Sequence, residues 1–466
     1  MTTSTTRALR RLGYALSFGA MLGAGSAHAV DLWDAASHFQ YNIEKVGVTA
    51  LATVPPSYSV KVVFSVTDPK LSDMPWDIKN AVPFQSAGAQ LTLDIGWDPG
   101  ADFTNTGSRG GTFTPLTALG DAPAAPVQVR NLTSKTAGTA RECTVADCGP
   151  TGLNRYFAVA TITPLPFPAG AKSGRVALEG RPVCNGVPGV SCPPPALPPA
   201  TPYLNVPARS AMVNFTLAPT APLAAMTADP RRAVVDINKC TTCHNDADHG
   251  TGFVPRLSLH GANRNENLGV CVICHNANQT DVAYRRATIA GDDPRIGGLE
   301  VPIDFKTMVH SIHAGGFREK PFVVIGRSSS VNDFSDVRFP RELRDCTSCH
   351  LDANGSGTFE LPLRTGVLGT TVKTMSSYLS TPRSIDVNPA NDVKISPTAA
   401  VCSSCHDKAE VKSHMVKTGG ASFATTQAAI GTTVRERCAS CHGPGKDKDV
   451  RRAHEIGRSG DDSHDD

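Results

Sequence analysis

The stretch Cys240-Thr-Thr-Cys243-His244 carries the pattern that decides how this chain is organised. The same spacing returns four more times, in Cys271-Val-Ile-Cys274-His275, Cys346-Thr-Ser-Cys349-His350, Cys402-Ser-Ser-Cys405-His406 and Cys438-Ala-Ser-Cys441-His442. Cys-x-x-Cys-His is the attachment pattern of c-type haem, in which the two thiols bond the porphyrin and the histidine binds the iron. The sequence therefore predicts five covalently attached haems, all in the C-terminal half of the chain.

A Cys-x-x-Cys pair alone also occurs in zinc sites and in dithiol redox centres. Haem is favoured here because every copy is followed by histidine and because the chain starts like an exported protein. Residues 1–29 combine a basic stretch, an apolar run from Leu12 to Leu22 and the small-residue cleavage pattern Ala27-His28-Ala29, which is typical of a secretory signal peptide. We expect export and a mature chain that begins at Val30.

Composition bears on the class of function. The formal charge is +3, and the expected signal peptide contributes three arginines and no acidic residue, so the mature polypeptide has no net charge (+3 − 3 = 0). Nucleic-acid binding requires a basic surface, and it therefore has no support. The apolar run of the signal is shorter than the ~20 residues of a spanning helix, and no later segment is apolar enough. We expect no transmembrane segment in the mature chain.

Residues 30–226 form a β-rich, haem-free region with short alternating runs separated by Gly and Pro clusters, which predicts a small sandwich or barrel. The expected strands are Tyr58–Thr67, Gln90–Trp97, Arg155–Thr163, Gly174–Glu179 and Ser210–Leu217. The proline-rich stretch 192–202 is expected to be a stiff loop. Over residues 227–466 the strand patterns fade, and we expect a pentahaem cytochrome c domain with short helices around the motifs and long loops.

Four cysteines lie outside the haem motifs, in two local pairs. An oxidising compartment favours disulfides, so we expect bridges between Cys143 and Cys148 and between Cys184 and Cys192. Loop geometry that keeps one pair reduced, or a redox-switch role for either pair, remains the alternative.

The other histidines supply candidates for the second axial position of each iron. An iron with histidine on both faces is coordinatively saturated and suits electron transfer, whereas an open position suits binding or chemistry. His310 and His313 are three residues apart on an expected helix, so they share a face and should serve two haems packed close together. His414 lies about 12 Å along a helix from His406 and should serve a neighbouring haem. His454 and His260 complete the candidate set, with His249 as a competitor and with His38 and His464 expected at the surface.

Several stretches of residues 235–454 match a known pattern: Lys239–His244, Leu259–Gly261 with Arg264, Cys271–Asn276, Asp304–His313, Arg338–Pro340, Ser413–Met415 and Cys438–Gly445 with His454. On these stretches the chain resembles the pentahaem module of outer-membrane decahaem cytochromes of the OmcA/MtrC family. The resemblance implies that His260, His310, His313, His414 and His454 are distal haem ligands. The β-rich region is similar to the split-barrel domain that precedes such a module. Family members typically carry ten or more haems, a second barrel and a lipid anchor.

The resemblance implies extracytoplasmic electron transfer through five bis-histidine c-type haems, in extracellular or dissimilatory respiration of Fe(III) or Mn. The implied partners are other multihaem cytochromes, an outer-membrane porin, metal oxides or flavins, and the implied location is the outer-membrane surface or the periplasm. A terminal metal reductase is the enzymatic form of the same function.

Two alternatives remain beside this function. The chain also fits a periplasmic electron shuttle. A pentahaem enzyme resembling nitrite reductase has a comparable length and haem number, but it needs an open catalytic haem whose motif ends in lysine, and all five motifs here end in histidine.

Overall fold

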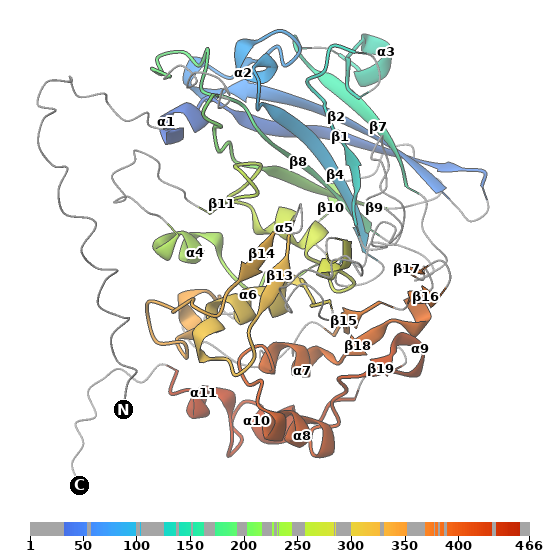
Figure 1. The fold of residues 1–466 in the computed structure, drawn as a ribbon. Helices are drawn as coiled ribbons and strands as arrows, with labels where there is room; N and C mark the ends of the chain where they lie inside the picture. The colour runs from blue at the N-terminus through green and yellow to red at the C-terminus, as the bar shows by residue number, and fades with distance from the viewer. Residues whose placement is uncertain are drawn as a thin grey trace, which may run out of the picture.

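The structure is a computed structural model that describes most of residues 32–456. The residues outside the description are 1–31, 54–56, 99–102, 104–124, 137–138, 151, 163–172, 193–202, 217–225, 228–230, 232, 245–256, 284, 286–299, 327–329, 352–368, 377, 381–382, 386–388, 431–434 and 457–466. The expected signal peptide, the proline-rich stretch beyond Cys192, His249 and His464 therefore lie outside the described residues. Figure 1 shows a β-sheet half above a half of short helices and small sheets.

The first sheet of the β half is built around a long hairpin. Strands β1 (Gln40–Leu51) and β2 (Ser57–Asp68) pair antiparallel from Gln40↔Thr67 to Leu51↔Ser57. β2 also pairs with β7 (Tyr156–Ile162), and the short strands β3 (Met74–Pro75) and β6 (Arg141–Glu142) extend the sheet. The register of β1 shifts between Ile43 and Lys45, so Glu44 forms a bulge.

The second sheet has the strand order β10-β9-β8-β4-β5. Its members are β4 (Gln90–Asp98), β5 (Val127–Val129), β8 (Ser173–Arg181), β9 (Ala211–Thr216) and β10 (Met226–Thr227). Alternate residues of its interior strand β4, Leu91 to Trp97, enter the same apolar core as alternate residues of β2, Val60 to Val66. The two sheets therefore pack face to face around one core, as period-two alternation predicts.

The expected β-rich half is confirmed, and its two sheets are not closed into a barrel within the described residues. The observed β2, β4, β7, β8 and β9 correspond to the five expected strands, with ends that differ by at most two residues. β1 was not expected. Strand β10 spans the expected domain boundary between residues 226 and 227, and this boundary stays a prediction.

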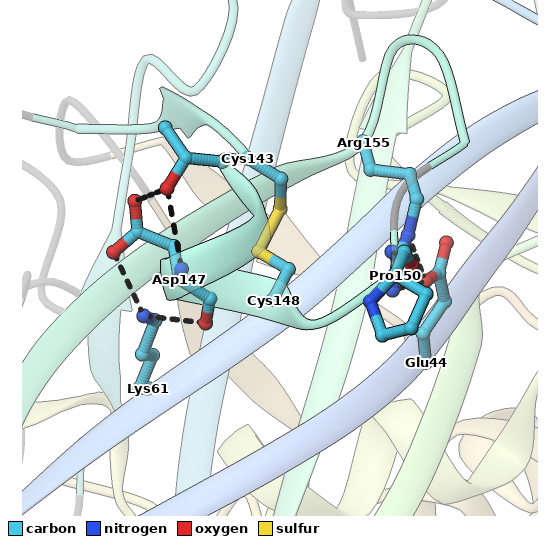
Figure 2. Close-up of a disulfide and its surroundings, with 8 residues drawn as sticks. Glu44, Lys61, Cys143, Asp147, Cys148, Pro150 and Arg155 are labelled. Atoms are coloured by element: carbon cyan, nitrogen blue, oxygen red, sulfur yellow. Dashed lines mark hydrogen bonds and ion pairs between the residues drawn. A yellow bond between two sulfur atoms is a disulfide. The ribbon is translucent and has the colours of Figure 1, made fainter.

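Both expected disulfides are present, between Cys143 and Cys148 and between Cys184 and Cys192. The first begins just before α3 (Val145–Cys148) and lies on the outer face of the first sheet (Figure 2), where Cys148 packs with Val63 and Phe157. Lys61 Nζ donates to the backbone oxygen of Asp147 at 2.8 Å and holds this loop on the sheet. Short helices α1 (Leu32–Ala36) and α2 (Val82–Gln85) complete the half.

The C-terminal half consists of short elements, as expected from its sequence. Its helices are α4 (Ile237–Cys243), α5 (Leu268–Cys274), α6 (Phe305–His313), α7 (Pro397–Cys402), α8 (Ala409–Lys417), α9 (Gln427–Ile430), α10 (Ala439–His442) and α11 (Val450–Ala453). Its strands are β11 (Ser258–Leu259), β12 (Arg264–Asn265), β13 (Val323–Ile325), β14 (Val331–Asp333), β15 (Val372–Met375), β16 (Tyr378–Ser380), β17 (Arg383–Ile385), β18 (Val393–Ile395) and β19 (Thr425–Thr426). Among the described residues, no helix has the length and apolarity to span a bilayer.

The two halves meet where α5 and the β11–β12 hairpin lie against the second sheet (Figure 1). Val270 and Ile273 of α5 are buried against Ala177 of β8 and Met212 of β9. The second haem motif, Cys271–His275, is therefore built directly on the β half.

Candidate functional site

All five Cys-x-x-Cys-His motifs adopt one backbone turn. In each motif the backbone N–H of the histidine donates to the carbonyl of the first cysteine, at 2.8–3.0 Å. This is the hydrogen bond of a helical turn, in which residues three and four apart share a face. The arrangement therefore presents two thiols and one imidazole from the same side of the chain, as attachment to a flat porphyrin requires. None of these ten motif cysteines takes part in a disulfide.

Each motif histidine faces one of the five other candidate histidines. We number these histidine pairs 1 to 5 in motif order: His244–His313, His275–His260, His350–His310, His406–His454 and His442–His414. Their ring centroids are 6.1, 6.0, 5.9, 5.9 and 6.3 Å apart, respectively.

The spacing within the pairs can be compared with that of two imidazoles bound to one metal ion. Metal–nitrogen bonds of about 2 Å place the two coordinating nitrogens about 4 Å apart, and the ring centroids lie one ring radius further on each side, at roughly 6 Å. The ten residues therefore fit a group whose iron is held between two histidines. The planes of pairs 2 and 3 are inclined by 31° and 19°, whereas those of pairs 1 and 5 are nearly perpendicular.

Hydrogen bonds orient half of these imidazoles. Nδ1 lies 2.6–3.0 Å from a backbone carbonyl in His275, His310, His313, His442 and His454. A carbonyl only accepts, so Nδ1 carries the proton and Nε2 keeps its lone pair. In His310, His313 and His454 the acceptor is the carbonyl four residues earlier, so the helix that carries or precedes each side chain orients it. Such bonds are the usual support of a metal-bound histidine.

The local electrostatics favour neutral imidazoles. Desolvation lowers the pKa of six paired histidines: His244, His260, His275, His310, His350 and His406. The pKa falls to about 3 for His260, where the Arg264 and His275 charges add to desolvation, and to about 4 for His350. A metal-binding imidazole must be deprotonated, so the environment selects the binding form.

Helix α6 brings three of the pairs together. His310 and His313 face different motif histidines, which makes pairs 1 and 3 neighbours. The N–H of Phe305, the first residue of α6, donates to the carbonyl of His275 at 2.9 Å, which ties pair 2 to the same helix. Lys239, beside motif 1, donates through Nζ to the carbonyl of His350 at 2.7 Å.

In pairs 4 and 5, each non-motif histidine faces the motif that is more distant from it in sequence. His414, on α8, faces His442 of the fifth motif, and His454, at the end of α11, faces His406 of the fourth. This arrangement places His414 opposite a neighbouring motif and not opposite its nearest motif in sequence.

One histidine lies differently from its expected position. His38 was expected at the surface, but it is buried and its Nδ1 lies 2.8 Å from Asp68 Oδ2. The β1–β2 pairing explains this contact: Gln40 pairs with Thr67, so His38 and Asp68 come together at the same end of the two strands. Arg264, which contacts Glu179 and Asp94 of the β half, was not singled out for any role at the junction.

Repeated attachment motifs with facing histidines define the class of multihaem c-type cytochromes. Residues 232–455 match the family model described as outer membrane cytochrome MtrC/MtrF-like, domains II/IV. The C-terminal half of the chain is thus similar to domains II/IV of MtrC/MtrF-like outer membrane cytochromes, and the resemblance expected from the sequence is confirmed. The match supports c-type haem and electron transport in this half.

A solved structure was also found to be similar. The crystal structure of MtrC from Shewanella baltica OS185 aligns with 89% of this chain and 53% of that chain, at 15% sequence identity and a TM-score of 0.46. This chain thus spans about half the length of that MtrC chain. A comparison with curated proteins gave no match.

Proposed function

We propose that this protein carries electrons outside the cytoplasm through five c-type haems, each held by one histidine pair, in extracellular or dissimilatory respiration of Fe(III) or Mn. The observation that carries the proposal is the matching of five motif histidines to five facing histidines at 5.9–6.3 Å. Haem iron held by two imidazoles supplies a one-electron carrier.

The roles of the chain's own residues follow from this assignment. Cys240, Cys243, Cys271, Cys274, Cys346, Cys349, Cys402, Cys405, Cys438 and Cys441 attach the groups, and the ten paired histidines fill both axial positions. No side chain has to transfer a proton or attack a substrate, so the protein supplies ligands, burial and spacing. Helix α6, which serves pairs 1 and 3 and contacts motif 2, keeps three carriers close together.

The setting proposed for this transfer is the cell exterior or the periplasm. Similarity to outer membrane cytochromes supports export and an electron partner of the same class. Other multihaem cytochromes are the proposed donors or acceptors, with a porin, metal oxides or flavins as further partners. Protease treatment of intact cells distinguishes the two locations, because only a protein at the cell surface is digested.

The decisive experiment is a haem count with spectroscopy on the purified holoprotein. We expect five haems per chain, a low-spin spectrum in the oxidised state and no uptake of carbon monoxide after reduction. Fewer than five haems, or carbon monoxide binding at several centres, would overturn the proposal. Mixing the reduced protein with ferric citrate in a stopped-flow instrument tests the acceptor, and we expect complete reoxidation.

A further inference from the structure

His260 differs from the other four non-motif histidines in the element that carries it. His310 and His313 lie on α6, His414 lies on α8 and His454 caps α11. His260 instead begins the turn 260–263 of the β11–β12 hairpin, in which Leu259 pairs with Arg264. This turn lacks the helix that orients the other ligands.

The backbone of this turn is in an unusual conformation. His260, Gly261 and Ala262 all have left-handed φ values, of 54°, 65° and 65°. Non-glycine residues avoid this region, and they keep it only where surrounding structure holds them. The contacts that hold the turn therefore decide where the His260 imidazole points.

Strand β8 of the N-terminal half supplies two of these contacts. Gly180 N–H donates to the carbonyl of Asn263 at 3.0 Å, and Arg181 Nη1 donates to the carbonyl of Gly261 at 2.6 Å. A Cβ at Gly261 would lie 2.6 Å from Arg181 Nη1, so the turn and the guanidinium fit closely. Arg181 Nε also donates to the carbonyl of Gly88, at 3.1 Å, which fixes the arginine itself.

The strand after the turn is anchored to the same sheet by charge. Arg264 Nη2 donates to Glu179 Oε1 at 2.7 Å and lies 3.6 Å from Asp94 Oδ2. Both carboxyl groups are buried, at 3% and 1% exposure, so the guanidinium is bound by two acidic groups that little solvent reaches. Next to it, Asn265 and Ser210 exchange hydrogen bonds, with Ser210 N–H donating to the carbonyl of Asn265 at 3.1 Å and Asn265 N–H donating to Ser210 Oγ at 3.2 Å.

The partner of His260 is fixed on the same surface. His275 follows helix α5, whose Val270 and Ile273 pack on the second sheet. Arg175 Nη1 from β8 donates to the carbonyl of Gly269, in the first turn of α5, at 2.7 Å. Both members of pair 2 are thus held by contacts with β8, His260 through the β11–β12 hairpin and His275 through helix α5.

We propose that β8 is the positioning element of pair 2, with Arg181 and Glu179 holding the 260–263 turn so that His260 faces His275. The inference rests on the proposed function, since it takes pair 2 as the two ligands of one haem. It makes the β half a structural part of one electron-carrying site. Arg181 and Glu179 are positioning residues, because they act through the turn and touch neither imidazole in the contacts described above.

The experiment compares full-length holoproteins with and without the Arg181 contact. In Arg181→Ala we expect five covalent haems, because both thiols of motif 2 remain, but one of the five becomes high-spin and binds one carbon monoxide per chain after reduction. Arg155→Ala is the matched control. This β-half arginine donates to the carbonyl of Pro150 at 2.8 Å and to Glu44 at 2.6 Å, and it makes no described contact with the β11–β12 hairpin. We expect Arg155→Ala to behave as wild type.

Two further measurements separate positioning from loss of folding. Gly261→Ala disturbs the same contact without a change of charge and should give the same single high-spin haem. Added imidazole should return Arg181→Ala to the low-spin state, and Arg181→Lys should be affected less than Arg181→Ala. The far-ultraviolet circular dichroism spectrum of the full-length protein should be unchanged in all these variants.

The outcomes distinguish the two proposals. If Arg181→Ala and Gly261→Ala keep five low-spin haems and bind no carbon monoxide, β8 does not position pair 2 and the proposed function stands. If the wild-type protein already binds carbon monoxide at several haems, the proposed function fails first. Recovery of Arg181→Ala by imidazole would support a displaced His260, whereas carbon monoxide binding that imidazole does not suppress would contradict it.

Discussion

The two halves of this molecule are stabilised in different ways. The β half encloses one continuous apolar core between two sheets, with Trp97, Phe64 and Leu93 at most 1% exposed. Within the described residues, the C-terminal half has only small apolar clusters, such as the one around Val372 and Met415. Its described helices have nine residues or fewer, too few to be stable alone. Under the proposed function, porphyrins bound at the five motifs would supply apolar surface in place of a second core of side chains.

The C-terminal half also buries two lysine side chains on neighbouring strands. Lys373 and Lys394, on β15 and β18, are 2% and 1% exposed. Lys373 Nζ lies 3.3 Å from Asp392 Oδ2, and Lys394 donates to Asn278. Buried cations stabilise a fold only where partners compensate desolvation, so the position of these two lysines depends on their polar contacts.

The largest effect should follow from removing the haems. We expect a chain in which all ten motif cysteines are replaced by alanine to keep the two sheets folded and to lose the structure of α6 and α8. Apolar burial maintains the first half without help, and little of it is present in the second. Hydrogen exchange followed by mass spectrometry measures both halves in one sample. Slow exchange in α6 of this variant would show that the C-terminal half is stable without haem, as the β half is.

A smaller and more local loss should follow from a cavity in the β core. Leu93→Ala removes a fully buried side chain and should lower the free energy of unfolding of the β half by about 2–5 kcal/mol. Leu153→Ala makes the same chemical change at 80% exposure and should cost less than about 0.5 kcal/mol. Denaturant titration followed by tryptophan fluorescence reports the β half, and the Soret band reports the other. Equal losses for the two variants would contradict the assigned core.

Much of the β half could be predicted from sequence because alternation is a local signal. The bulge at Glu44 explains why β1 was missed: Tyr41 and Ile43 face the core before it and Val46 and Val48 after it, so the alternation changes phase. Arg155 holds this bulge through a bond from Nε to Glu44 at 2.6 Å (Figure 2). A single-phase pattern search fails at such a position.

The C-terminal half is harder to predict from sequence, because its histidine pairs depend on contacts between distant residues. The motifs indicate which residues are expected to attach haem, but the partner of each motif histidine depends on tertiary packing. Helical spacing predicts that His414 serves a neighbouring motif, but it does not show that this motif contains His442 or that His454 faces His406. The burial of His38 against Asp68 likewise depends on a contact between residues 30 positions apart.

The buried lysine gives the C-terminal half a pH dependence. Desolvation, with the nearby Lys373 charge, lowers the pKa of Lys394 from 10.5 to about 7. Between these values the unfolded chain holds a proton that the folded chain lacks, so this group makes stability rise with pH over that range. Lys394→Met should remove this contribution, whereas Lys417→Met, at an exposed position on α8, should leave it. Chemical denaturation from pH 7 to 10 checks the difference, and parallel curves for Lys394→Met and wild type would refute it.

The smallest expected effect compares the two disulfides within the β half. Each closes a short loop, so the chain-entropy contribution of either bridge is only about 2–3 kcal/mol. Cys184 belongs to the main core, whereas Cys148 belongs to a small cluster with Val63 and Phe157 on the outer face of the first sheet. Replacing Cys184 and Cys192 by alanine should therefore destabilise the sheets more than replacing Cys143 and Cys148. Thermal unfolding of the two double variants ranks them, and the opposite order would mean that the outer loop contributes more to this half than the core does.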